Sequence, residues 1–200
     1  MSIVVGLTGG LGCGKSTVLE MFGDLGWHIV SADAICRELY ETQDPELVGA
    51  IRERWGEGVI AGDGSIDRPA IAAIVFEDSA ELAFLNDLLH PMVRGRFIDF
   101  LKQHPDDDVI FEVPLLFEAE WSSMFDAVIA VWSPESTVVE NLKKRGVLHT
   151  DYERRIRNQM APSLKLERAD FGLINSGNIE ILKSQVEIIS NKLMKGNLHV

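Results

Sequence analysis

Residues 6–17, GLTGGLGCGKST, are the stretch that decides the fold. A short run of β-forming residues at positions 3–7 leads into it. An apolar pattern with helical spacing follows over residues 18–25 and stops at Gly26. Residues 27–30 form a second β-type run. Strand, glycine-rich loop, helix and strand within about 30 residues predict a parallel βαβ unit.

The loop itself fits the pattern G-x-x-x-x-G-K-[ST]. Glycines let backbone N–H groups turn toward phosphate oxygens, and the helix that follows offers the positive end of its dipole. Lys15 supplies a cation for the β- and γ-phosphates, and Ser16 a hydroxyl for Mg²⁺. The alternative is a glycine loop without a ligand. The predicted phosphate-binding residues are Gly9, Gly10, Leu11, Gly12, Cys13, Gly14, Lys15, Ser16 and Thr17.

The remaining segments place sheet-forming residues at both ends of the chain, around a helical middle. Further strands are predicted over residues 109–113, 127–132 and 171–174. Helices are predicted over residues 34–40, 45–55, 68–76, 79–89, 92–103, 134–145, 151–160 and 179–194. We therefore predict an α/β parallel-sheet core of residues 1–33, 108–133 and 170–200, with a helical substrate-binding insertion at 34–107 and a lid at 134–169. A single compact α/β domain with long connections is the alternative.

Composition limits the partners and the compartment. The 200 residues are 46% hydrophobic and carry a formal net charge of −12, which suits a soluble globular protein and disfavours nucleic acid or an anionic membrane as a partner. The longest apolar run is 7 residues, against about 20 for a membrane span. The first residues read as a strand rather than a signal peptide, and two cysteines make no disulfide framework. We expect a cytoplasmic protein, whose oligomeric state the sequence does not indicate.

Asp33 directly follows the second predicted strand. Ligands of parallel sheets bind beyond the carboxyl ends of the strands, where the phosphate loop also lies. At that place Asp33 can accept the proton of an acceptor hydroxyl or hold Mg²⁺ through water. The alternative is that Asp33 caps the following helix. A GTPase switch is poorly supported, because the chain has no D-x-x-G, and its one Asn-Lys pair does not continue as N-K-x-D.

Further motifs accompany the loop along nearly the whole chain: Ala32-Asp33 with Arg37-Glu38-Leu39, residues 63–68, His90-Pro91, residues 113–118 (VPLLFE), residues 155–160, Ala169-Asp170 and Asn175-Ser176-Gly177. Together they resemble the dephospho-CoA kinase family. The resemblance implies a nucleoside-monophosphate-kinase-like core with a helical CoA-binding region and a lid. It also implies Mg²⁺-dependent transfer of the ATP γ-phosphate to the ribose 3′-hydroxyl of dephospho-CoA, the last step of coenzyme A biosynthesis.

The resemblance also implies roles for individual residues. Asp33 matches the catalytic base and contacts the acceptor, while Lys15 and the lid residue Arg145 act on the transferred phosphate. The residues implied in acceptor binding are His90, Arg94 and Arg155, and Asn175 is implied at the adenine. Glu118 is implied in orienting site residues, with a solvated helix start as its alternative.

Three positions depart from the family's usual pattern. Ser31 stands where many members have Asp, which removes a metal role there. Glu112 stands where Asp is frequent and keeps a carboxylate with a longer reach, so Glu112 and Glu118 both stay open as contacts of Mg²⁺ through water. Cys13 replaces the common Ser. A thiol near a helix start can be acidic, so an oxidation-sensitive switch and a small loop-filling residue are both open for Cys13.

Charge is distributed unevenly along the chain. Residues 143–168 hold eight basic and three acidic side chains, a local charge of +5, whereas the rest of the chain carries −17. This stretch is interpreted as a lid that closes arginines over phosphates and excludes water, with a solvated helix face as the alternative. Another metabolite kinase and a nucleotide-dependent switch are the competing functions. Phosphorylation of a nucleoside monophosphate, or ATP hydrolysis without a phosphorylated product, would distinguish them.

Overall fold

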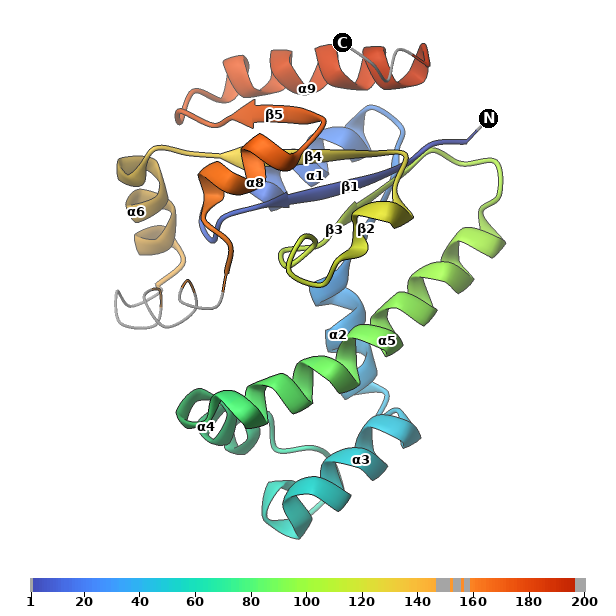
Figure 1. Ribbon diagram of the computed structural model, residues 1–200, viewed down its shortest axis with the longest axis vertical. Coiled ribbons are helices and arrows are strands. Elements are labelled where there is room, and N and C mark those ends of the chain that lie inside the picture. Colours follow the sequence, from blue (N-terminus) through green and yellow to red (C-terminus); the bar gives the residue numbers. More distant parts are fainter. Residues whose placement is uncertain (1, 147–151, 153–155, 157–158, 197–200) are drawn as a thin grey trace. The chain divides into compact units, whose positions relative to one another are not determined.

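A computed structural model describes residues 2–146, 152, 156 and 159–196 (Figure 1). Contacts within the chain divide it into two compact units. The strand unit comprises Met1–Ser31 with His104–Val200, and the helical unit comprises Ala32–Gln103. This division into two units does not test the predicted limits of the core, the insertion and the lid, which stay a prediction.

The strand unit is built on a five-stranded parallel sheet with the order β2-β3-β1-β4-β5. The strands are β1 (Val4–Gly9), β2 (His28–Ser31), β3 (Val109–Glu112), β4 (Ala127–Trp132) and β5 (Phe171–Ile174). All five were predicted to within two residues at each end. The α/β parallel-sheet core is thereby confirmed. The short 3₁₀ helix η2 (Trp121–Met124) connects β3 to β4.

Helices cover both faces of this sheet. Helices α1 (Lys15–Asp24) and α9 (Ile179–Met194) share one face, and α8 (Pro162–Arg168) lies on the opposite face (Figure 1). Alternate strand residues such as Val5, Leu7 and Ile129 are fully buried with Phe22 and Val186 of the two helices, as strand periodicity requires. Helix α6 (Glu135–Lys144) follows β4. The sequence did not predict helix α8.

The helical unit contains α2 (Ala32–Glu41), α3 (Pro45–Trp55), η1 (Gly56–Val59), α4 (Arg68–Glu77) and α5 (Ser79–Gln103). Local chemistry sets two of the helix starts. Asp44 accepts a hydrogen bond from the Glu46 N–H, Asp67 accepts one from the Ala70 N–H, and a proline occupies the first turn of each helix.

Helix α5 corrects one prediction. Two helices were expected, separated at His90-Pro91, because proline disfavours the α conformation of the residue before it. The structure has one helix of 25 residues with Pro91 inside it. Leu85, Val93 and Phe97 of this helix are buried, so tertiary packing offsets the hydrogen bond that the proline removes.

The predicted helix at residues 151–160 lies mostly outside the described residues. Within the described parts of the chain, none of the helices combines the length and apolar character needed to cross a membrane.

Candidate functional site

The phosphate loop connects β1 to α1, and its backbone requires glycine. Gly9, Gly12 and Gly14 have φ angles of 146°, 78° and 95°, a region that side chains with a Cβ rarely adopt. A Cβ on Gly9 would stand 2.3 Å from the Val131 carbonyl oxygen, and one on Gly14 would stand 2.5 Å from Asn175 Nδ2. Sterics therefore explain the pattern of glycines.

Lys15 folds back across the loop. Its Nζ donates to the carbonyl oxygens of Gly9, at 3.2 Å, and Gly10, at 2.9 Å. The Lys15 side chain is only 8% exposed. A positive charge is thus held inside the ring of loop backbone at the carboxyl end of β1.

The start of α1 fits a nucleotide phosphate. Gly14 is the N-cap and makes no side-chain cap hydrogen bond, and the first-turn N–H groups of a helix have no partner within that helix. Ser16 and Thr17 lie in this turn and are partly exposed. Backbone donors, the helix dipole, Lys15 and the Ser16 hydroxyl form a donor set that suits phosphate with Mg²⁺.

Side chains from the ends of β4 and β5 hold the loop from outside. Asn175 Nδ2 and Ser133 Oγ both donate to the Cys13 carbonyl, at 3.0 and 2.9 Å. Asn141 Nδ2 of α6 donates to the Gly12 carbonyl at 2.8 Å. Ser133 and Asn141 were not predicted, and no sequence pattern singles them out. Asn175 is placed against Gly14 of the loop, and its proposed contact with adenine stays a prediction.

The Cys13 side chain belongs to the core. It is 1% exposed and packs in the cluster with Leu7, Val18 and Val131. Burial raises the pKa of the Cys13 thiol, although the charge of Lys15 opposes the shift. A buried thiol with a raised pKa is a poor nucleophile. The structure therefore favours the small loop-filling residue over the oxidation-sensitive switch.

A buried ion pair lies beneath the loop on the α8 face, and Lys165 is its unpredicted member. Lys165 Nζ lies 2.9 Å from Glu118 Oε1 and donates to the Pro114 carbonyl at 2.5 Å. Glu118 Oε1 also accepts the Met160 N–H at 2.7 Å. The Lys165 side chain is fully buried, and burial lowers the pKa of its ammonium group against the opposing effect of Glu118. Glu118 lies in a turn, so the solvated helix start was wrong.

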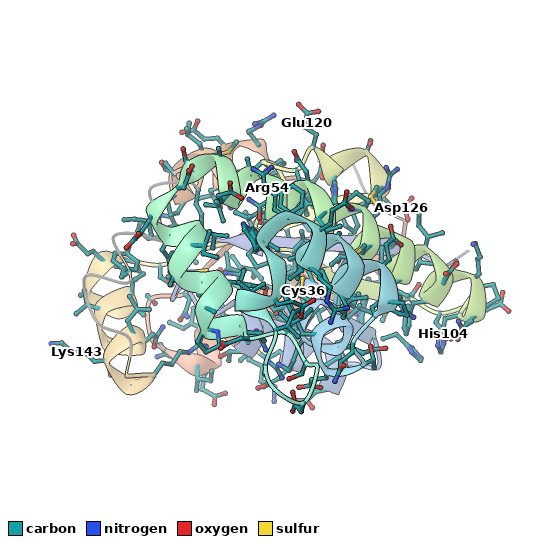
Figure 2. All side chains as sticks on the ribbon, turned by 90° about the horizontal axis from the view of Figure 1, so that it is seen from below. Cys36, Arg54, His104, Glu120, Asp126 and Lys143 are labelled. Carbon is teal, nitrogen blue, oxygen red and sulfur yellow. The ribbon has the colours of Figure 1, made fainter. Side chains whose placement is uncertain are left out.

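This pair also corrects the interpretation of the basic stretch. Lys165 was counted among its free charges, but it neutralises Glu118 within the protein. Lys144 pairs with Glu140 at 2.8 Å, and Arg168 lies over the Phe117 ring. Lys143 points away from α6 in Figure 2. Arg145 is exposed at the end of α6, and Arg155 lies outside the described residues.

Asp33 lies in the helical unit, two residues beyond the end of β2. Helix α2 begins at Ala32, so Asp33 occupies the first turn rather than the N-cap position that was its alternative. It is exposed. The Cys36 thiol lies one turn further, and its pKa is raised to about 11, first by burial and then by the negative charge of Asp33. The carboxylate of Asp33 therefore lies close enough to Cys36 to disfavour ionisation of its thiol.

The predicted acceptor residues His90 and Arg94 lie one turn apart on α5. His90 is half-buried, and burial lowers the pKa of its imidazole. Arg94 is exposed. In the strand unit, Glu112 ends β3 and is 7% exposed, with Leu7 and Ser31 as its neighbours on the two adjacent strands. A water-mediated Mg²⁺ contact of Glu112 or Glu118 stays a prediction.

We expect Lys165→Met to lower the free energy of unfolding by about 3–5 kcal/mol, because it leaves the Glu118 carboxylate buried without its cation. Urea unfolding followed by circular dichroism measures the loss. The double variant Lys165→Met/Glu118→Gln is the matched control and should recover part of it, since glutamine removes the charge and still accepts the Met160 N–H. A loss below about 1 kcal/mol in the single variant would contradict this account.

Known proteins resemble this chain over most of its length. A family model described as "Dephospho-CoA kinase" matches residues 3–180. A protein of Leifsonia xyli named dephospho-CoA kinase is 38% identical over 191 residues, which cover 93% of this chain and 96% of that protein. A crystal structure of a Thermus thermophilus protein superposes with a TM-score of 0.81 and 30% identity, over 96% of this chain and 98% of that chain. A structure named dephospho-CoA kinase from Campylobacter jejuni has a TM-score of 0.72 and 23% identity, covering 98% of this chain and all of that chain, and shows the shared fold.

Proposed function

Because the chain belongs to the dephospho-CoA kinase family, we propose that it transfers the γ-phosphate of ATP to the ribose 3′-hydroxyl of dephospho-CoA, giving CoA and ADP. The observation that carries this proposal is the position of Lys15. Its ammonium group lies within the glycine loop, at the uncapped start of α1. Phosphoryl transfer depends mainly on positioning and charge stabilisation, which this arrangement supplies.

Each part of the phosphate site has a definite task in this proposal. The N–H groups of residues 9–17 and the α1 dipole bind and orient the phosphates of ATP. Lys15 stabilises the negative charge that develops between the β- and γ-phosphates. Ser16 would hold Mg²⁺, and the bound ion would neutralise negative charge on the phosphates. Ser133, Asn141 and Asn175 maintain the loop conformation through its carbonyl groups.

The acceptor side rests on residues whose roles the family resemblance implies. Asp33 holds the 3′-hydroxyl and accepts its proton as the new bond to phosphorus forms. His90, Arg94 and Arg155 bind the acceptor, and Arg145 closes over the transferred phosphate as part of a lid. Closure of that lid would exclude water, which otherwise competes with the hydroxyl for the γ-phosphate. We also expect a cytoplasmic location, consistent with the two free cysteines.

Incubation of the full chain with ATP, Mg²⁺ and dephospho-CoA tests the proposal directly. Mass spectrometry should detect a product heavier by one phosphoryl group, and fragmentation should place that group on the 3′-oxygen of the ribose. Phosphorylation of a nucleoside monophosphate without dephospho-CoA activity would identify a different metabolite kinase. ATP hydrolysis without any phosphorylated product would instead indicate a nucleotide-dependent switch.

A further inference from the structure

Two histidines and one aspartate meet at the amino end of the sheet, at the edge opposite the phosphate loop. His28 begins β2, and His104 and Asp107 lie in the turn before β3. One possible ligand atom from each side chain lies within 4.8 Å of the other two. The four residues of β3 rise about 13 Å between this edge and the carboxyl edge. The cluster is therefore separate from the site for ATP and Mg²⁺.

The spacing of the ligand atoms suits a small divalent cation. Asp107 Oδ2 lies 3.4 Å from His28 Nε2 and 2.9 Å from His104 Nδ1. A tetrahedral zinc ion with bonds of about 2.0–2.1 Å separates neighbouring ligand atoms by about 3.3 Å. The two separations from Asp107 bracket that value, and the separation between the two histidine nitrogens lies within 4.8 Å. The imidazole rings, with centroids 5.0 Å apart, lie close enough to share one ion.

The backbone that carries these side chains is fixed by hydrogen bonds. The His28 N–H donates to the Asp108 carbonyl at 2.8 Å, which joins β2 to the turn. The Ile3 N–H donates to Asp108 Oδ1 at 3.0 Å, and Ser2 Oγ donates to the Pro105 carbonyl at 2.9 Å. The turn is thus held by the segment that precedes β1 and by the first residue of β2. Ligands on a fixed backbone bind a metal without a large ordering cost.

Solvent reaches the cluster. The side chains of His28, Asp107 and His104 are 44%, 38% and 32% exposed, and Figure 2 shows His104 at the outer edge of the view. A hydrated ion can therefore enter and keep one water as its fourth ligand. Two imidazoles and one carboxylate favour the zinc class over Mg²⁺, which prefers oxygen ligands.

We propose that His28, His104 and Asp107 bind one divalent cation of the zinc class, with water as the fourth ligand. His28 precedes the helical unit in the chain, and His104 and Asp107 follow it. The ion would connect these two segments of the strand unit. Because it binds the folded arrangement and not the unfolded chain, it should stabilise the fold.

Titration of the full chain with Co²⁺ and then Zn²⁺, without nucleotide or Mg²⁺, tests the site. We expect one equivalent of Co²⁺ with the strong visible absorption of four-coordinate cobalt, displacement of the Co²⁺ by Zn²⁺, and a higher melting temperature with Zn²⁺. His28→Gln, His104→Gln and Asp107→Asn should each weaken the affinity more than about tenfold and remove the thermal shift.

Two matched variants serve as controls. Asp106→Asn removes the same charge one residue away, and His90→Gln removes a histidine of the helical unit. Both variants should bind Co²⁺ and Zn²⁺ with the affinity of the unchanged protein. If a cluster variant fails to fold, Zn²⁺-induced shifts of the His28 and His104 imidazole resonances in the unchanged protein provide the second readout. Absence of Co²⁺ binding, binding unaltered by the cluster variants, or unshifted His28 and His104 resonances would overturn the proposal.

Discussion

Asp33→Asn is expected to lower kcat by about 10²–10⁴-fold, the usual contribution of a general base. The amide keeps the size of the side chain but cannot accept the proton of the acceptor hydroxyl. The proposed phosphate contacts come from residues 9–17, on the other side of β2 in the chain, so the affinity for ATP should hardly change. Steady-state turnover at saturating substrates and calorimetric titration with ATP measure the two effects separately.

Helix stability is the other role open to Asp33. A carboxylate in the first turn of α2 interacts favourably with the helix dipole, which is worth at most about 1 kcal/mol at an exposed position. Unfolding of Asp33→Asn should show no larger loss. Glu41→Gln is the matched control, because it removes the same charge from an exposed position at the other end of α2 and should leave kcat unchanged. Near-normal turnover of Asp33→Asn would refute the assignment of the base.

Lys15→Met is expected to reduce kcat by about 10²–10³-fold, comparable to the loss of one preorganised donor to a developing charge. It should also weaken ATP binding, which distinguishes it from Asp33→Asn. The methylene chain of methionine retains much of the packing, whereas the ammonium group between the Gly9 and Gly10 carbonyls is lost. The change therefore reports on charge at the phosphates rather than on volume.

Two further variants sharpen the test of Lys15. Lys15→Arg should not restore activity, because a planar guanidinium does not reproduce the compact ammonium group that donates to both loop carbonyls. Lys183→Ala removes an exposed lysine from α9 and should leave both kcat and ATP affinity unchanged. Circular dichroism confirms that the variants are folded. If Lys15→Met bound ATP and turned over like the unchanged protein, the phosphate loop would not be the nucleotide site.

Local patterns were sufficient to predict the centre of the fold. The spacing of apolar residues predicted β1, α1 and β2, and the glycines with Lys15 and Ser16 predicted a loop that binds phosphate. These properties depend on residues close together in the chain, where the strand and helix periods and the conformational freedom of glycine act directly. The fold class could be predicted for the same reason, because alternating strands and helices favour a parallel sheet.

Tertiary structure decided the features that depend on residues distant in sequence. The order β2-β3-β1-β4-β5 rests on pairing between strands far apart in the sequence, such as β1 with β3 and with β4. Lys165 lies in the basic stretch of residues 143–168, which is typical of an exposed surface. It is nevertheless buried, because Glu118, 47 positions earlier, supplies its counter-charge. Pro91 stays within α5 because of the packing of that helix. The sequence by itself thus determined the strands and the phosphate loop of this protein. Burial and long-range pairing determined which charges stay free to meet a phosphate, because the energy of a charge depends on neighbours that only the folded chain brings together.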